Sequence, residues 1–544
     1  MSSSAMSATH RCLLVNEIFQ VIAEELYENG GQRTLSALAR TCKVLHEAVL
    51  PVLWNSLDSI VPLLRLFPPD TWSEIQNPDG GNVLRIIKPD ALVWTRFNHY
   101  APHVRKLIWK DRSDVSLLAL SALSVYRPMD HPLLPELRTL MWCEDRPPYF
   151  AFIHLFLSPT IRELGLTSSD FDAGEIMALL DNAARICTQV ELVTICTSMM
   201  AESSPICTEA IGEAFARFIR ATPNLKAFNA ELCLTAPCVE ALAALPRLEM
   251  LDLFIGPKDM EAIAASAARV SSKGCWFPSL GLLALNVIRL DANTKTFLGA
   301  IQSPSLLELA ITTLRQPDAH MLKQQFEVLA RGPWRDTLMT LVLEFEHPRY
   351  ENAPPPPSLD VGYALQPLYA LPELDTFAIR GPSVAVDSST LRSIANAWSK
   401  LEFLSIIGYL PHPPAERCVE LEDLVPFARK CPDLHALELH LNATFVPDEA
   451  AMTRLLPEPS SSRLRSLTVY EAPISGPQNV ADVLERLFPM AHVVDYRGEG
   501  TFPEDAQRGF EMDWQEVQKI LQCRLSARMA TGPEHVSACA LSSW

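Results

Sequence analysis

The sequence lacks the long apolar stretches that membrane-spanning helices need. No run of about 18 or more uncharged apolar residues occurs in it, whereas a helix that crosses a bilayer needs about 20. Positive charge is also scarce: 46 Lys and Arg residues stand against 64 Asp and Glu, for a formal net charge of -18. Nucleic acids and anionic lipid surfaces both attract clustered positive charge. We therefore expect neither nucleic acid nor membrane among the partners of this protein.

Signals for secretion and for a disulfide framework are missing as well. The segment from Met1 to His10 is rich in Ser and Ala, but it has no basic region followed by an apolar one, as a secretory signal would. The 13 cysteines are an odd number and form no Cys-x-x-Cys pair, so we expect reduced thiols rather than disulfides. Both features indicate a protein of the cytoplasm or the nucleus.

Motifs for catalysis and for cofactor binding are absent too. The sequence has no Gly-x-x-x-x-Gly-Lys-Ser/Thr phosphate loop, no Gly-x-Ser-x-Gly nucleophile elbow and no His-Glu-x-x-His metal site. We therefore expect no catalytic residue, no cofactor and no metal ion, and we do not expect an enzyme. A hydrolase or transferase would need a nucleophile and a base that the fold brings together in a deep polar pocket.

What the sequence does contain is a repeated leucine frame, Pro-x-Leu-x-x-Leu-x-Leu. In the copy from Cys431 to Asn442, Leu437 and Leu439 alternate with polar residues. This period of two puts both leucines on one face of a short strand and Glu438 on the other face. The first leucine position of the frame occurs fourteen times, at intervals of 23 to 36 residues. These positions are 104, 137, 161, 190, 225, 248, 280, 306, 338, 374, 401, 434, 464 and 491.

Proline precedes most of these positions. The residue two before the first leucine is Pro in ten of the fourteen copies, where an average Pro usage of about 5% predicts roughly one. Proline has no backbone N–H and disfavours the helical conformation in the residue before it, so it ends a helix and starts an extended segment. Between the copies, apolar residues recur at helical spacing, as at Ile211, Phe215 and Ile219. The chain thus predicts a cycle of helix, proline, strand and turn.

A unit of one strand and one helix cannot bury both of its apolar faces alone, so successive units must stack. We therefore expect an α/β fold, a solenoid with a curved parallel sheet on its concave side and helices on its convex side. The frame resembles that of the leucine-rich repeat family, and the expected solenoid spans residues 102–500. The Asn or Cys that this family places three residues after the last leucine remains only as Asn442 and Cys233. Irregular turns are the expected result.

Helices are expected before the first repeat. From Leu13 to Leu26 the apolar residues step by four, along one stripe of a helix. Thr34 can cap a second helix, and a third short helix is expected to stop at Pro51. Residues 11–67 are therefore expected to form a small all-α module.

Three runs within this module carry a resemblance to a known family. They are Leu13 to Ile22 with Leu26, Leu35 to Lys43, and Leu50 to Trp54. These runs resemble an F-box of the type abundant in fungi, although Val15 stands where many members of the family have proline. The F-box docks onto the Skp-type adaptor of a cullin ubiquitin ligase, so the resemblance implies an adaptor and a cullin scaffold as partners. The residues that the resemblance assigns to adaptor binding are Leu14, Ile18, Ile22, Leu38, Cys42, Leu53 and Trp54.

The strand residues that point away from the frame leucines form the second candidate site. Many are acidic or aromatic, and exposed aromatic side chains are frequent anchors at protein interfaces. Our hypothesis is that this face binds a protein in which basic residues flank an apolar element. The alternative, that the carboxylates merely solvate an acidic protein, stays open. The candidate residues are Glu231, Asp252, Phe254, Glu308, Glu344, Phe403, Glu438, His440 and Tyr470.

The remaining segments complete the expected organisation. Residues 1–10 and 531–544 are expected to be disordered ends, 68–101 a helical connector, and 501–530 a helix that caps the array. Together with the resemblance to F-box proteins with C-terminal leucine-rich repeats, this implies the substrate-recognition subunit of a cullin-type ubiquitin ligase. The N-terminal helices would bind the adaptor, and the repeats would bind a substrate protein of unknown identity. Two alternatives stay open: an interaction scaffold without ligase function, and N-terminal helices that only cap the repeats.

Overall fold

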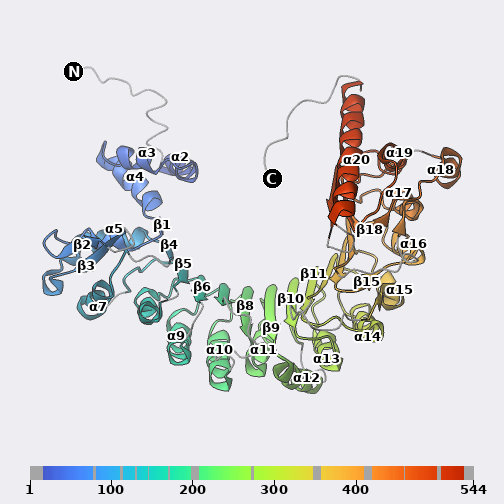
Figure 1. Ribbon diagram of the computed structural model, residues 1–544. Coiled ribbons are helices and arrows are strands. Elements are labelled where there is room, and N and C mark those ends of the chain that lie inside the picture. Colours follow the sequence, from blue (N-terminus) through green and yellow to red (C-terminus); the bar gives the residue numbers. More distant parts are fainter. Residues whose placement is uncertain are drawn as a thin grey trace. The chain divides into compact units, whose positions relative to one another are not determined.

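Figure 1 shows the computed structural model of the chain. The chain consists of two compact units, Met1–Phe254 and Ile255–Trp544. The predicted adaptor residue Leu14 lies outside the described residues, as do segment 1–10 and all of the predicted tail after Thr531. The structure describes residues 16–76, 81–110, 114–128, 132–144, 146–168, 172–197, 208–270, 275–346, 357–409, 419–458, 460–498 and 504–531.

The first unit begins with three helices and continues into a parallel sheet. The N-terminal helices are α2 (Asn16–Glu28), α3 (Gln32–Leu38) and α4 (Lys43–Leu53). The strands, in their order across the sheet, are β1 (Ser56–Leu57), β4 (Lys106–Trp109), β5 (Thr139–Cys143), β6 (Glu163–Ser168), β7 (Leu192–Thr197), β8 (Ala227–Cys233) and β9 (Met250–Ile255). The helices between them include α5 (Val61–Leu64), α6 (Trp94–Tyr100), α7 (Leu117–Tyr126), α8 (Pro147–Phe150), α9 (Ala173–Ile186), α10 (Glu209–Ala221) and α11 (Ala236–Ala243).

The second unit repeats the same alternation of parallel strands and helices. Its main strands, in spatial order, are β10 (Leu282–Val287), β11 (Glu308–Thr313), β12 (Thr340–Phe345), β14 (Thr376–Gly381), β16 (Phe403–Gly408), β18 (Ala436–Asn442), β19 (Ser466–Tyr470) and β20 (Val493–Arg497). Its helices include α12 (Pro257–Val270), α13 (Ala292–Ala300), α14 (Ala319–Leu329), α15 (Val361–Leu365), α16 (Ser388–Ala397), α17 (Val425–Lys430), α18 (Glu449–Leu455), α19 (Pro477–Leu487) and α20 (Glu504–Thr531).

The leucine frame marks the strands of both units. A strand begins two residues after each of the fourteen frame positions. The parallel register aligns equivalent leucines, as in the row Leu404, Leu437 and Leu467 across β16, β18 and β19, and all three are buried. The predicted α/β leucine-rich-repeat fold is therefore confirmed. The short strand β1, which pairs with β4, was not predicted.

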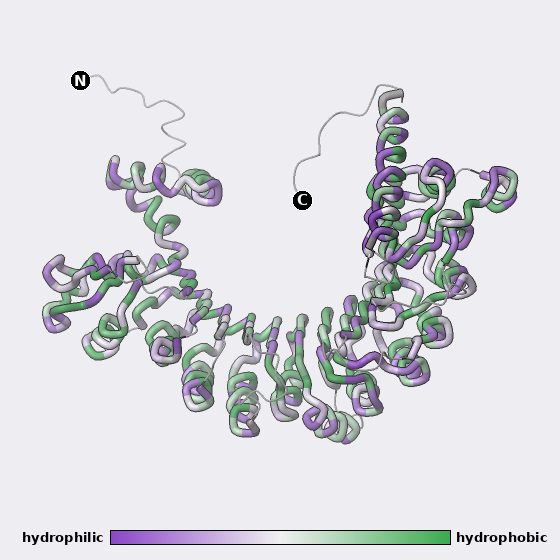
Figure 2. The backbone as a smooth tube through the Cα atoms, viewed as in Figure 1, coloured by the Kyte–Doolittle hydropathy of each residue, from purple (hydrophilic) through white to green (hydrophobic). Residues whose placement is uncertain are grey.

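Within each unit the helices lie along one face of the sheet (Figure 1), and the frame leucines are buried. Along their turns they carry both hydrophobic and hydrophilic residues (Figure 2). In α10, Ile211, Phe215 and Ile219 are buried, and the helix begins where the Thr208 hydroxyl accepts the backbone N–H of Ile211. Other helices start in the same way, because a Ser or Asp oxygen satisfies a backbone N–H that has no partner in the first turn. These capping residues are Ser116, Asp172, Asp291, Asp318, Asp360, Asp387 and Asp448.

The segment before the first repeats shows what patterning alone did not resolve. The expected helical connector 68–101 contains α6 but also an antiparallel hairpin of β2 (Trp72–Gln76) and β3 (Asn82–Ile86). These short strands mix polar and apolar residues without a clear period, and cross-strand contacts such as Arg85 Nε to Ser73 Oγ, 3.0 Å, join them. At the other end, α20 packs on β20, and its buried Trp514 donates Nε1–H to the Ala472 carbonyl.

Candidate protein-interaction surfaces

Helices α2, α3 and α4 form a small core of their own. Phe19 and Ala23 of α2 pack with Leu35 of α3 and with Val49 and Val52 of α4, and all five side chains are buried. Phe19 and Ala23 stand four residues apart, so they lie on one side of α2. The module therefore already buries an apolar side of α2 without a partner protein.

A second side of α2 is apolar and exposed. Ile18, Val21 and Ile22 keep 45%, 65% and 39% of their surface accessible, and Val44 in the first turn of α4 keeps 48%. The steps of three and four residues place the three α2 side chains together on one side of the helix. Clustered exposed apolar side chains of this kind mark interaction sites in soluble proteins. We call Ile18, Val21 and Ile22 the α2 patch.

The structure separates the predicted adaptor residues into groups. Ile18 and Ile22 belong to the α2 patch, and Cys42 just before α4 is also exposed. Leu38 and Leu53, in contrast, are partly buried against the core of the module, where they support the helices. Val21 was not among the predicted adaptor residues, although its position three residues after Ile18 is a signal that the sequence contains.

Trp54 connects the helical module to the first repeat. Its ring lies 4.7 Å from the ring of Tyr100 at the end of α6, measured between centroids. The next residue, Asn55, accepts backbone hydrogen bonds from Arg105 and Lys106 through its carbonyl, at 2.9 and 2.8 Å. Trp54 thus packs inside the first unit, and the module is attached to the repeats by several contacts rather than by a free linker.

On the first unit, Phe254 does not have the predicted exposure. Only 8% of its surface is accessible, so the prediction of an exposed aromatic anchor at this position is wrong. The alternation of β9 ends at Leu253, because Phe254 and Ile255 are both buried. The facing strand β8 also changes register between Ala230 and Cys233, and Cys233 is the residue that pairs with Phe254.

The two predicted carboxylates of the first unit raise the pKa of a neighbouring thiol. Glu231 on β8 is exposed and Asp252 on β9 is half-buried. Burial raises the pKa of Cys196 on β7, and the charge of Glu231, the nearby Cys143 and the charge of Asp252 raise it further. The Cys196 thiol is therefore protonated at neutral pH. Strands β7, β8 and β9 thus place an uncharged thiol beside two carboxylates.

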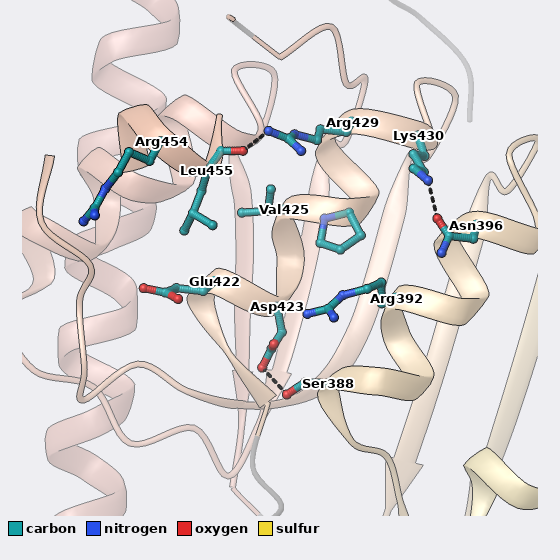
Figure 3. A pocket seen from close by; sticks show the side chains of 11 residues that line it. Ser388, Arg392, Asn396, Glu422, Asp423, Val425, Arg429, Lys430, Arg454 and Leu455 are labelled. Atoms are coloured by element: carbon teal, nitrogen blue, oxygen red, sulfur yellow. Dashed lines mark hydrogen bonds between the residues drawn. The ribbon is translucent and has the colours of Figure 1, made fainter. Parts of the chain in front are cut away.

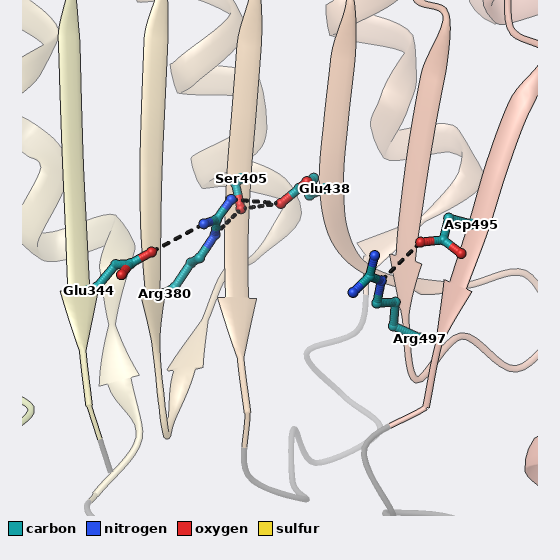
Figure 4. A network of polar contacts seen from close by, with 6 residues as sticks. All are labelled: Glu344, Arg380, Ser405, Glu438, Asp495 and Arg497. Carbon is teal, nitrogen blue, oxygen red and sulfur yellow. Dashed lines mark hydrogen bonds and ion pairs between the residues drawn. The ribbon is translucent and has the colours of Figure 1, made fainter. Parts of the chain in front are cut away.

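On the second unit, a chain of polar contacts crosses four neighbouring strands (Figure 4). Arg380 on β14 forms ion pairs with Glu344 on β12, 3.2 Å, and with Glu438 on β18, 3.0 Å. Its Nε donates to the Ser405 hydroxyl on β16 at 3.0 Å, and that hydroxyl donates to Glu438 at 2.8 Å. We call these four residues the Arg380 network. Two of the predicted substrate-binding carboxylates are thus compensated by an arginine of the same chain.

Solvent reaches the Arg380 network only in part. The Arg380 and Glu438 side chains are 27% and 21% exposed. Burial opposes the charge on Arg380 more than any other single influence, but Glu438 and Glu344 together hold its pKa above the usual value. Ion pairs that are partly withdrawn from water interact more strongly than surface pairs. The carboxylates of this network therefore connect strands of the same chain and do not need a cation from a partner.

The aromatic candidates on this unit are half-buried. The Nε2 atom of His440 lies 2.9 Å from the carbonyl oxygen of Gly408 and 3.1 Å from its backbone nitrogen. Burial lowers the pKa of His440 and outweighs the influence of Gly408 and Glu471, so the imidazole is neutral near pH 7. Its ring lies 6.0 Å from that of Tyr470. Like Phe403, these two side chains offer a partner only part of their surface.

Glu308, the first residue of β11, differs from the other predicted carboxylates. It is exposed, and within the described parts of the chain its carboxylate has no hydrogen bond or ion pair. Its charge raises the pKa of Asp375, after the larger effects of burial and of Glu402. The structure therefore places Glu308 with two acidic residues that the sequence did not single out.

The helix side of the second unit holds a charged cavity of about 360 Å³ between α16, α17 and α18 (Figure 3). Arg429 donates a hydrogen bond to the carbonyl of Leu455, and the Ser388 hydroxyl donates to Asp423 at 2.8 Å. No histidine is among the residues that line this cavity, and the partner of the Ser388 hydroxyl there is a carboxylate rather than an imidazole. The charged lining residues are Arg392, Arg429, Lys430, Arg454, Glu422 and Asp423.

Neither a protein-family model nor a curated protein matches this chain. Among solved structures, 34 chains match. One belongs to the crystal structure of the Rad7 and Elc1 complex in yeast; it is 14% identical at a TM-score of 0.37, and the match covers 63% of this chain and 78% of that chain. In the described residues, no helix is both long and apolar enough to cross a membrane, and no group of three or more His, Cys, Asp or Glu residues could hold a metal ion. Function is therefore inferred from the surfaces above.

Proposed function

We propose that this protein is a non-enzymatic substrate receptor of a cullin-type ubiquitin ligase. In this proposal the α2 patch binds a Skp-type adaptor, and the repeats bind a substrate protein to which other subunits transfer ubiquitin. The observation that carries the proposal is the exposure of Ile18, Val21 and Ile22 on a module that already has a complete core. The resemblance of residues 11–67 to an F-box supports the choice of partner.

The α2 patch can supply useful binding energy. Full burial of an aliphatic side chain is worth about 1.5–3 kcal/mol, and these three side chains are roughly half-exposed before binding. Covering all three would contribute a few kcal/mol, the scale expected of an interface centre. A carboxylate placed there would have to lose its hydration on binding, which opposes association strongly.

The attachment of the module suits this role. The packing of Trp54 on Tyr100 and the backbone bonds from Arg105 and Lys106 to Asn55 hold α4 against the first repeat. An adaptor bound to α2 would therefore keep a defined position relative to the strands of the first unit. A receptor needs such positioning, because ubiquitin transfer depends on where the substrate is presented.

The test is capture of a Skp-type adaptor and cullin by the full chain. We expect the double variant Ile18→Asp/Ile22→Asp to weaken adaptor binding by about 100-fold, since two charges would enter an apolar interface. Leu118→Asp is the matched control, because Leu118 is an exposed apolar residue on α7 of the same unit, and it should bind as the parent does. Circular dichroism verifies that all variants are folded.

Two results would contradict the proposal. Undiminished capture by the Ile18→Asp/Ile22→Asp variant would remove the α2 patch as the docking surface. Failure of the parent chain to capture any adaptor or cullin, while it still binds a protein through its repeats, would instead support a scaffold without ligase function.

A further inference from the structure

The residues just before the strands of the second unit form a continuous row. The backbone N–H of Met339 donates to Leu307, that of Asp375 donates to Met339, and that of Glu402 donates to Asp375, at 2.9, 3.0 and 2.7 Å. Each of the four residues therefore lies beside the next, on neighbouring strands that are about 4.8 Å apart. We call Leu307, Met339, Asp375 and Glu402 the leading edge.

One half of the leading edge is apolar and exposed. Leu307 and Met339 keep 44% and 42% of their surface accessible, although most large apolar residues of the repeats are buried. Single exposed apolar residues are normal on protein surfaces, but adjacent ones offer a patch that a partner can cover. A methionine is well suited to such contact, because its flexible thioether adapts to different shapes.

The other half of the leading edge is acidic. Asp375 and Glu402 are neighbours in the row, and Glu308 follows Leu307 at the start of β11. Burial, then the charges of Glu402 and Glu308, raise the pKa of Asp375 against the opposing effect of the Thr376 hydroxyl. Within the described residues no cation pairs with Glu308, Asp375 or Glu402, and the nearby Lys400 pairs with Glu373 at 2.5 Å. Like charges are thus held together, and only hydrogen bonds from the Thr376 hydroxyl and the backbone to Asp375 oppose their repulsion.

The repeat itself does not require acidic residues at this position. In the first unit the equivalent residues before β4, β5 and β6 are Arg105, Arg138 and Arg162, which the same backbone bonds connect at 2.7 Å each. Either sign of charge is therefore compatible with the turn into the strand. In the second unit the row continues after Glu402 with His435 and Arg465, so the acidic and apolar character of the leading edge is a property of these particular repeats.

We propose that the leading edge binds a peptide segment of a partner protein in which Lys or Arg residues flank one or two large apolar side chains. The apolar side chains of the segment cover Leu307 and Met339, and its cations pair with Glu308, Asp375 and Glu402. This surface deepens the proposed function by naming the class of substrate, and in that respect it rests on the ligase proposal. The binding reaction does not depend on the adaptor.

The experiment uses the full chain and a fluorescein-labelled synthetic peptide, Lys-Arg-Leu-Leu-Lys-Arg, titrated by fluorescence anisotropy. We expect Asp375→Asn/Glu402→Gln to weaken binding about tenfold, since two uncompensated carboxylates are lost without a change in size. Leu307→Ser/Met339→Ser should weaken it by a similar factor through loss of apolar contact. The matched control is Glu249→Gln, an exposed carboxylate at the equivalent position before β9 of the first unit, which should leave binding unchanged.

Salt separates the two contributions. Binding by the parent chain should weaken as ionic strength rises, because exposed charges are screened. The Asp375→Asn/Glu402→Gln variant should lose most of this dependence, whereas Leu307→Ser/Met339→Ser should keep it. Equal binding by the parent and both double variants, no binding by the parent, or equal binding of an acidic peptide, Glu-Asp-Leu-Leu-Glu-Asp, would each overturn the proposal.

Adaptor capture by the same variants distinguishes this proposal from the ligase proposal. Asp375→Asn/Glu402→Gln should capture the adaptor as the parent does, and Ile18→Asp/Ile22→Asp should bind the peptide as the parent does. A chain that binds the peptide but no adaptor would contradict the ligase role alone. A chain that captures the adaptor but not the peptide would contradict the leading edge as a binding site alone.

Discussion

The Arg380 network and the leading edge each hold two carboxylates on the sheet of the second unit, and the two pairs have opposite surroundings. In the network, Glu344 on β12 and Glu438 on β18 share Arg380 on β14, and Ser405 on β16 completes the contacts. At the leading edge, Asp375 and Glu402 lie side by side just before β14 and β16, and in the described part of the chain no Lys or Arg forms an ion pair with either of them. The same residue type is therefore paired within the chain in one row and, in our proposal, binds a partner in the other.

The difference teaches that neighbouring strands, not residue type, decide the role of a surface carboxylate. Arg380 lies 36 residues from Glu344 and 58 residues from Glu438 in the sequence. The register that pairs Glu344 with Arg380 is set by apolar alternation along β12 and β14. Charge compensation in a repeat protein thus follows from stacking order, which a scan of acidic residues along one strand does not reveal.

The largest expected effect comes from removal of Arg380. Arg380→Met should lower the free energy of unfolding by about 2 kcal/mol, since Glu344, Glu438 and Ser405 lose their shared partner in a partly buried site. Urea unfolding followed by circular dichroism measures this. Arg497→Met is the control, because the Arg497–Asp495 pair shown beside the network in Figure 4 is exposed; its unfolding midpoint should not change. Equal losses of unfolding free energy in Arg380→Met and Arg497→Met would show that the Arg380 network is no more stabilising than an exposed ion pair.

A smaller effect is expected from Ser405. Its buried hydroxyl connects Arg380 Nε to Glu438, so Ser405→Ala should lower the free energy of unfolding by about 1 kcal/mol. Residues of one network are coupled, so the loss in the Arg380→Met/Ser405→Ala double variant should be less than the sum of the single losses. Strict additivity in the urea experiment would show that the four residues do not act together.

The smallest effect is expected at the leading edge, and with the opposite sign. The folded-state pKa of Asp375 is raised, so near neutral pH its charge favours the unfolded state, and Asp375→Asn should raise the unfolding midpoint slightly. As pH falls through the raised pKa, the folded parent chain takes up a proton before the unfolded chain does, and its stability approaches that of the variant. Urea unfolding at neutral and acidic pH verifies this. A lower midpoint for Asp375→Asn at neutral pH would mean that Asp375 stabilises the fold.

Much of the fold could be predicted because the signals are local. Strand alternation, prolines before the strands and capping residues each act within a few residues, so every frame position was followed by a strand. The hairpin of β2 and β3 escaped prediction, since its short strands carry no clear period. Phe254 was wrongly predicted to be exposed, because the alternation of β9 ends at Leu253 and β8 changes register opposite Phe254.

The candidate sites could be predicted less completely. The resemblance to an F-box named Ile18 and Ile22, both of which are exposed, but it did not separate them from Leu38 and Leu53, which support the core. A helix of this size has apolar residues on more than one side, and only its packed neighbours determine which side is left uncovered. The spacing of Val21 from Ile18 was visible in the sequence, but only the packed core shows that this side of α2 is the uncovered one.

The sequence by itself determined the repeat, the direction of its leucines and the acidic character of the chain, because these depend on spacing and composition. The tertiary structure alone decided that Glu344 and Glu438 share Arg380 and that Leu307 and Met339 lie beside Asp375 and Glu402. The physical reason is distance along the chain. Which charges meet across strands depends on register between segments tens of residues apart, and that register exists only after the repeats have stacked.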